Sequence, residues 1–177
     1  MQNDPAVERY ADALFETALA HKSLEEVQQD LEQFTAVYEE SDQLNRFLRS
    51  FRVTAADKVR VFRKVFSEQM NQYVLNTIAL MLQHQRAAII PELRRAFTEK
   101  IKTHQNIIDV YAYTAHPMDD DIRAQVKTAL ENVLEKQVDL IESVDESLQG
   151  GIKLRIKNTV YDGTITHQLA KLREQLS

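Results

Sequence analysis

The hydrophobic period of the chain changes at Gln105-Asn-Ile-Ile-Asp-Val-Tyr-Ala-Tyr113. Before this stretch, apolar residues recur every three or four positions, as on one face of an α-helix. Within the stretch, apolar and more polar residues alternate, as in a β-strand with one buried face. The change predicts a domain boundary, with an N-terminal domain over residues 1–105 and a C-terminal domain over residues 106–177.

The N-terminal part predicts helices without a sheet. The chain has only three glycines, Gly150, Gly151 and Gly163, and all of them lie near its C-terminus. A sheet-rich fold needs turns that usually recruit Gly, Pro or Asn. Helical spacing of the apolar residues predicts six helices, whose apolar faces span residues 7–18, 24–38, 44–51, 59–66, 75–82 and 90–101.

Two residue pairs predict helix starts within this part. Ser23 and Glu26 have the spacing of a capping box, in which each side chain satisfies an unpaired backbone amide. Thr54 and Asp57 have the same spacing at the start of a later helix. We therefore expect both Ser23 and Thr54 to accept a hydrogen bond at a helix N-terminus.

The C-terminal part predicts strands and helices in alternation. After the strand near residues 108–112, Asp119 to Asp121 place negative charge at a helix start, which the helix dipole favours. Further strands are expected at residues 138–141 and 152–156. In the second of these strands, apolar residues alternate with cationic ones, which predicts one buried face and one cationic face. The helix between the first two strands is expected to turn one apolar face inward, formed by Ile122, Val126, Ala129 and Val133.

Four residues near the C-terminus are expected to form turns. Gly150 and Gly151 predict a turn into a strand, because neither the Lys-Ser/Thr nor the helix of a phosphate-binding loop follows them. Asp162 and Gly163 predict a tight turn in which Gly163 has a positive φ and Asp162 helps to cap a last helix. The fold class is therefore α+β, with an N-terminal six-helix bundle followed by a small β-α-β-β-α domain.

Charge and composition exclude several classes of function. The net charge is −5, with 14 basic against 15 acidic residues up to Gln105 and 8 against 12 beyond it, so no basic stripe for nucleic acid is expected. The chain has no Cys, and its five His residues are too scattered for a metal site. We expect no catalytic residue, no cofactor and no metal.

The sequence also lacks the features of a membrane-inserted protein. No apolar run approaches the ~20 residues that span a bilayer. The start Met1-Gln-Asn-Asp4 lacks the cationic region of a signal or transit peptide. A soluble protein without direct membrane insertion is expected.

Several motifs resemble one known family along the whole chain. They are the opening helix Tyr10-Ala-Asp-Ala-Leu-Phe15, Arg86, the strand Gly150-Gly-Ile-Lys-Leu-Arg-Ile156, and Val160-Tyr-Asp-Gly-Thr164 followed by Leu169 and Leu172. Together with the order of elements, they resemble the delta subunit family of F-type ATP synthase, which is called the oligomycin-sensitivity-conferring protein in mitochondria. The sequence departs from that pattern at surface or turn positions, namely His84, Lys157-Asn158-Thr159 and Thr164.

The resemblance implies a non-catalytic stator role. The N-terminal bundle would take up the N-terminal helix of an alpha subunit, and the C-terminal domain would hold the C-terminal end of the b subunits. Such a protein belongs to the peripheral stalk and couples ion flow to ATP synthesis. It would lie at the cytoplasmic face of the plasma membrane as a peripheral part of the complex.

The resemblance also implies where partners bind. A stripe of small residues on the first helix suggests close approach by another backbone, either within the bundle or from a partner helix, and the family places a groove between helices one and five. The candidate contacts for the alpha helix are Ala6, Tyr10, Ala13, Thr17, Ala20, Thr77, Leu80 and Met81. The candidate contacts for the b subunits are Ile165, Leu169, Leu172 and Leu176.

Two other classes of function remain as alternatives. The first is a helical protein-interaction adaptor unrelated to the synthase. The second is a small RNA-binding module in the C-terminal part, which is weakened by the net acidic charge and the absence of aromatic, basic strands.

Overall fold

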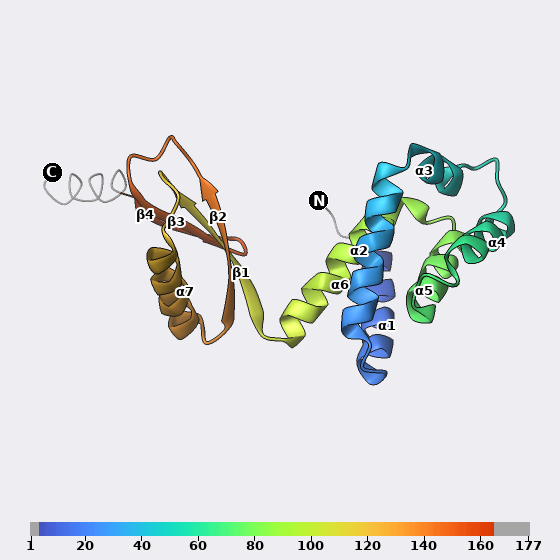
Figure 1. The fold of residues 1–177 in the computed structure, drawn as a ribbon, viewed down its shortest axis with the longest axis horizontal. Coiled ribbons are helices and arrows are strands. Elements are labelled where there is room, and N and C mark those ends of the chain that lie inside the picture. The colour runs from blue at the N-terminus through green and yellow to red at the C-terminus, as the bar shows by residue number, and fades with distance from the viewer. Residues whose placement is uncertain (1–3, 165–177) are drawn as a thin grey trace, which may run out of the picture. The chain divides into compact units, whose positions relative to one another are not determined.

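A computed structural model describes residues 4–164 of the chain. The fold is α+β, with helices in the first part and a sheet with one covering helix in the second (Figure 1). The chain divides into two compact units, with the boundary between Ile101 and Lys102. This boundary lies in the last turn of the helix that precedes the sheet, a few residues before the predicted position.

The first part of the chain contains only helical elements within the described residues. A short 3-10 helix, η1, precedes the last of the α-helices. The elements are α1 (Pro5–Ala20), α2 (Leu24–Glu40), α3 (Asp42–Arg49), α4 (Ala55–Phe66), α5 (Gln72–Gln83), η1 (Ala87–Ile89) and α6 (Ile90–His104).

Side-chain caps begin several of these helices. The Asp4 carboxylate accepts a hydrogen bond from the Ala6 amide at 2.9 Å, and proline follows at the first helical position, where its missing N–H costs little. The Thr54 hydroxyl oxygen accepts from the Asp57 amide at 3.1 Å, which confirms the predicted start of α4. These contacts satisfy amides that have no partner inside the helix.

The predicted capping box at Ser23 is wrong. The Ser23 side chain makes no cap hydrogen bond for α2, and its hydroxyl lies 3.5 Å from the Ala18 carbonyl. The reason is the end of α1, where the Ser23 amide donates to Ala18 at 2.9 Å and the Lys22 amide donates to Leu19 at 3.2 Å. This is a Schellman motif with Lys22 at φ 55°, so Ser23 completes α1 rather than capping α2.

Helix α5 ends in the same way. The Arg86 amide donates to the Met81 carbonyl at 2.9 Å, the Gln85 amide donates to Leu82 at 3.0 Å, and Gln85 has φ 57°. Glycine is the usual residue at this left-handed position because it has no Cβ. Since the first 149 residues contain no glycine, side-chain-bearing residues occupy both positions.

An aromatic cluster forms the centre of the first unit. The Phe34 ring meets the Phe62 and Phe66 rings edge to face, with centroid distances of 5.4 and 5.2 Å. Tyr38 lies next to Phe34, is 2% exposed and donates its hydroxyl hydrogen to the Ala87 carbonyl at 3.0 Å. These contacts join α2 to α4 and to η1 through one buried core.

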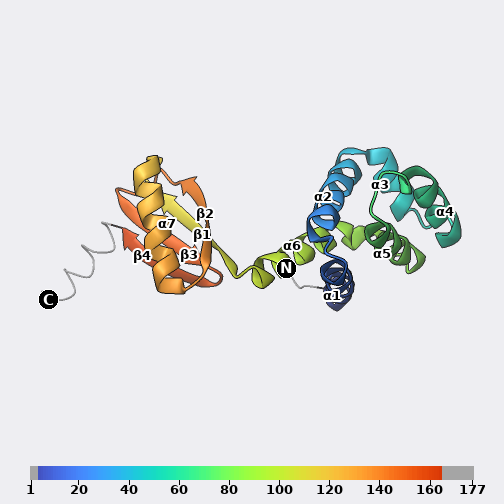
Figure 2. The same ribbon diagram turned by 60° about the horizontal axis from the view of Figure 1, so that its bottom comes forward.

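The second unit contains a four-stranded sheet and one described helix. The strands have the order β2-β1-β3-β4, in which β1 pairs parallel with β2 and antiparallel with β3. The elements are β1 (Ile107–Thr114), α7 (Asp120–Leu134), β2 (Gln137–Val144), β3 (Gly151–Ile156) and β4 (Thr159–Thr164). Helix α7 covers one face of the sheet (Figure 2).

Strand β4 corrects the predicted β-α-β-β-α order. Asp162 and Gly163 lie inside this strand, where Gly163 is opposite Ile152, and Gly163 does not have the expected positive φ. A Cβ at Gly163 would lie 3.0 Å from the Ile152 carbonyl oxygen, so glycine is needed here for close approach of two strands. The predicted last helix, with Ile165 onward, lies outside the described residues.

The inward face of α7 also differs from the prediction. No residue of α7 is buried, and Ile122 and Val133 are 48% and 80% exposed. Ala129 is also exposed, so Val126 is the one predicted residue that is partly buried, and Leu130 and Leu134 join it at helical spacing. None of the helices within residues 4–164 is both long and apolar enough to cross a membrane.

Candidate partner-binding site

The candidate site lies on α1 and α5, which contact each other. The His21 ring at the end of α1 lies 4.8 Å from the Tyr73 ring near the start of α5. The end of α1 therefore meets the start of α5.

Six of the eight predicted alpha-contact residues retain exposed surface. Leu80 is 43% exposed, although it is a large apolar residue on a helix that otherwise supplies much of the core. Ala13 and Ala20 are exposed, and Tyr10, Thr17 and Thr77 are half-buried. We define the α1–α5 face as Tyr10, Ala13, Thr17, Ala20, Thr77 and Leu80.

The other two predicted contact residues are buried. Ala6 is 2% exposed and Met81 is 0% exposed, so both belong to the interior of the first unit. Met81 also supplies the carbonyl that closes the α5 Schellman motif. Helical spacing identified the side of the helix on which they lie but not how deeply they are buried, because residues at the edge of a stripe can face the core.

Both threonine hydroxyls on the α1–α5 face donate to backbone carbonyls. The Thr17 hydroxyl donates to the Ala13 carbonyl at 2.7 Å, and the Thr77 hydroxyl donates to the Tyr73 carbonyl at 2.9 Å. Because each hydroxyl hydrogen bonds to the carbonyl four residues earlier in its own helix, neither threonine offers a free hydroxyl hydrogen to a partner. The face is therefore small, apolar and low in charge.

The opposite flank of α1 is held by charge and an aromatic contact. The Lys100 ammonium of α6 lies 2.6 Å from the Asp12 carboxylate and 3.2 Å from that of Glu8. The hydrogen bond to Asp12 raises the pKa of Lys100 above its ordinary value. The Phe15 and Phe97 rings meet edge to face at 6.2 Å. These contacts fix the rotation of α1, which directs the small-residue flank away from α6.

Sequence reasoning missed Tyr73 as a neighbour of this face. Tyr73, Thr77 and Leu80 lie at i, i+4 and i+7 on α5, so helical spacing alone was enough to group them. Tyr73 is half-buried, and its ring contacts the His21 ring at a tilt of 39° at one end of the α1–α5 face.

The predicted turn residues lie in the second unit. Gly150 and Gly151 have φ values of 142° and 85°, in the region that favours glycine, immediately before and at the start of β3. The Asp162 carboxylate accepts from the amide and the hydroxyl of Thr164, at 3.0 and 2.6 Å. The predicted b-subunit contacts Ile165, Leu169, Leu172 and Leu176 lie outside the described residues.

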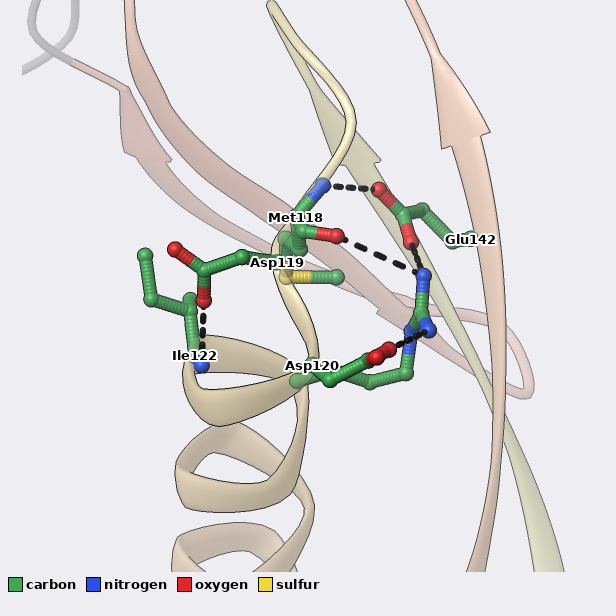
Figure 3. Close-up of polar contacts among 6 residues, drawn as sticks. Met118, Asp119, Asp120, Ile122 and Glu142 are labelled. Atoms are coloured by element: carbon green, nitrogen blue, oxygen red, sulfur yellow. Dashed lines mark hydrogen bonds and ion pairs between the residues drawn. The ribbon is translucent and has the colours of Figure 1, made fainter.

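The acidic cluster before α7 organises the helix start (Figure 3). Asp119 accepts from the Ile122 amide at 2.8 Å, and Asp120 pairs with Arg123 at 2.9 Å. Glu142 of β2 accepts from Arg123 at 2.8 Å and from the Met118 amide. Among the described residues, no group of three His, Asp or Glu side chains could hold a metal ion.

Replacing Glu142 with Gln is expected to lower stability at neutral pH and to leave it unchanged in acid. The hydrogen bond from Arg123, followed by that from the Met118 amide, lowers the pKa of Glu142 below its ordinary value. The stabilisation is therefore present above the unfolded-state pKa and is lost as the pH falls through the lower folded-state pKa. Urea midpoints measured from pH 7 down to acid would converge for the two proteins, and a constant difference would contradict the assignment.

Comparison with known proteins gives a consistent result over nearly the whole chain. Residues 6–176 match the family described as ATP synthase delta (OSCP) subunit. The chain is 32% identical to ATP synthase subunit delta of Bacillus subtilis (strain 168), covering 100% of this chain and 98% of that one. It is 28% identical to the subunit of the same name from Symbiobacterium thermophilum, covering 99% and 95%.

A solved structure has a similar fold. A chain in the cryo-EM structure of the Toxoplasma gondii mitochondrial ATP synthase hexamer aligns with a TM-score of 0.66 and 24% identity. The alignment covers 98% of each chain, so both units and their order along the sequence are shared.

Proposed function

The chain belongs to the ATP synthase delta (OSCP) subunit family, a component of the peripheral stalk of F-type ATP synthase, and we propose that it ties the catalytic head to that stalk. In this proposal α1 to α6 act as one six-helix bundle that binds the N-terminal helix of an alpha subunit. The second unit binds the C-terminal end of the b subunits. Family membership replaces the alternative of an adaptor unrelated to the synthase.

The observation that carries the head contact is the exposed Leu80 beside a flank of small residues. A partner helix buries an apolar face most effectively where the receiving backbone allows close approach and offers an apolar anchor. Ala13 and Ala20 permit that approach on α1, and Leu80 supplies the anchor on α5. The contact between α1 and α5 supports a single surface that contains both features.

The stalk contact is proposed for the second unit. The family match continues to residue 176 and so includes the candidate contacts Ile165, Leu169, Leu172 and Leu176. Within the described residues, the outer surface of α7 adds the exposed apolar side chains of Ile122 and Val133. An amphipathic b-subunit helix would bury such residues on binding.

The proposed role is mechanical and non-catalytic. During ATP synthesis the central shaft turns inside the head, and the head must be held so that ion flow does mechanical work on it. We propose that the subunit occupies this position at the cytoplasmic face of the membrane, as a peripheral part of the complex. The acidic cluster before α7, which resembles a set of metal ligands in sequence, supports a structural role because its members cap and pair with α7 and β2.

Replacing Ala13 with Arg is expected to weaken binding of the alpha N-terminal helix. The long cationic side chain would stand where the partner backbone approaches, at a cost of about 2 kcal/mol, which is roughly thirtyfold in Kd. The measurement is calorimetric titration of the full-length protein with a synthetic peptide of the cognate alpha N-terminal helix.

Ala36→Arg is the matched control for this titration. Ala36 is an exposed alanine in the middle of α2, away from the α1–α5 face, so the same substitution there should leave the Kd unchanged. Equal losses for the two variants, or no binding by the unaltered protein, would refute the proposed head contact.

A further inference from the structure

Lys58 of α4 is an unusual residue of the first unit. Its side chain is 3% exposed, and it is the one charged residue among the buried residues of the described chain. Within that part, no carboxylate lies within ion-pair distance of its ammonium group, whereas Lys100 and Lys102 each pair with two. Buried charges are normally paired, because transfer of an ammonium group out of water is costly.

The Lys58 ammonium nevertheless retains some contact with solvent. Thr35 and Thr114 are the two described residues with a side-chain oxygen or nitrogen that is fully buried and lacks a hydrogen-bond partner. Since Lys58 is not among them and has no hydrogen-bond partner in the described part of the chain, its ammonium group keeps a small contact with solvent, although the residue as a whole is only 3% exposed.

Exposed apolar residues flank this charge. Val61 and Val65 are 41% and 52% exposed, and they lie at i+3 and i+7 from Lys58 on one side of α4. Arg63 points the other way around the helix, because it donates to Asn76 of α5 at 2.9 Å. We call Lys58, Val61 and Val65 the α4 stripe, which lies on the flank of α4 away from α5.

The segment of sequence that contains the α4 stripe is cationic. Residues 42–66 contain seven Lys or Arg against two Asp, in a chain whose net charge is −5. Phe51, in the connection that leads into α4, is 89% exposed. A large exposed aromatic residue beside apolar and cationic groups is typical of a protein interface.

We propose that the α4 stripe binds an acidic amphipathic helix of a partner protein. A carboxylate of that helix would pair with Lys58, and its apolar residues at helical spacing would cover Val61 and Val65. Excess positive charge on α3 and α4 supplies the electrostatic complementarity. A nucleic acid would not require the valines, and Arg60 is already paired with Asp57 at 2.6 Å.

The proposal concerns a second surface, independent of the α1–α5 face. Isotope-labelled full-length protein would be titrated with a synthetic peptide of about 18 residues, built from Glu, Ala and Leu in an amphipathic pattern. We expect its NMR signals to shift at Phe51, Lys58, Val61 and Val65. The same peptide with Lys in place of Glu, and vesicles of anionic phospholipid, provide the comparison arms.

Lys58→Met tests the role of the charge while keeping the buried stem. We expect about tenfold weaker peptide binding, since a charge-assisted contact is lost. We also expect a higher urea midpoint, because methionine removes an unpaired ammonium group from a buried site. The control Lys136→Met removes an exposed lysine that lies outside residues 42–66 and should change neither quantity, and Leu80→Asp should not affect binding of this peptide.

Several results would overturn the proposal. They are equal binding of the Lys-containing peptide, binding of vesicles without binding of the acidic peptide, and unchanged affinity in Lys58→Met. A lower urea midpoint in Lys58→Met would assign the residue a structural role instead. Because Ala13→Arg tests the alpha-helix contact on a different surface, the two proposals can fail separately.

Discussion

Leu80→Asp is expected to weaken binding of the alpha N-terminal helix by about 3 kcal/mol, roughly a hundredfold or more in Kd. Leu80 is 43% exposed in the free protein, so it has apolar surface left to bury against a partner. Aspartate removes that gain and adds a carboxylate that must leave water when the complex forms. The same peptide titration measures the effect.

The functional consequence is expected in the assembled synthase. A complex that contains Leu80→Asp should hydrolyse ATP in its head while ATP-driven ion pumping into vesicles falls, because the head is no longer held. Leu19→Asp is the matched control, since Leu19 is a 40% exposed leucine on the other flank of α1, away from Ala13 and Leu80. Pumping lost equally in both variants would argue against a specific contact at Leu80.

Phe34→Ala is expected to lower the free energy of unfolding of the first unit by about 4 kcal/mol. Phe34 is 2% exposed and contacts the rings of Phe62 and Phe66 edge to face, so its removal leaves a cavity between α2 and α4. A domain is stable by roughly 5–15 kcal/mol, so most of that margin would be lost. Urea unfolding followed by circular dichroism measures the change.

Phe51→Ala provides the control for that measurement. Phe51 is 89% exposed, so its truncation should change the free energy of unfolding by less than about 0.5 kcal/mol. The sheet signal of the second unit should unfold at the same urea concentration in both variants, because Phe34 belongs to the core of the first unit. A comparable loss in Phe51→Ala would mean that burial does not explain the effect.

Periodicity predicted most of the secondary structure, because it reports which face of an element is buried. The change of period near Gln105 coincides with the end of α6 and the start of β1. The cap at Thr54 was also predictable, since it depends on a contact between neighbours in sequence. Ser23 was not, because the tight connection between α1 and α2 commits its amide to the Schellman motif of α1.

The second unit was harder to predict because its elements depend on pairing. Strand β4 contains Asp162-Gly163, a pair that is typical of a turn in sequence. Its Val160 and Tyr161 are also half exposed, so burial does not mark it as a strand. It is a strand because β3 supplies hydrogen-bond partners along its whole length. The rotation of α7 likewise depends on Arg123 pairing with Glu142 of β2, a contact that is distant in sequence.

The sequence predicted which side of each helix forms the candidate site, but not how deeply each residue on that side is buried. The stripe on α1 and its partner residues on α5 came from spacing together with the family resemblance, and six of the eight keep exposed surface. Ala6 and Met81 are buried because the edges of a helical stripe turn into the core wherever a neighbouring helix contacts them. Lys58 gave no sequence signal, since a lysine on an amphipathic helix is normally exposed.

The central position of β1 has a consequence for the order in which the protein forms during synthesis. β1 pairs on one edge with β2 and on the other with β3, and both follow it in the chain. All the helices of the first unit have been synthesised by the time β1 leaves the ribosome. Both edges of β1, in contrast, stay unpaired until β2 and β3 have been synthesised. Chaperone demand during translation should therefore peak while residues between β1 and β3 are being made, since unpaired strand edges promote aggregation.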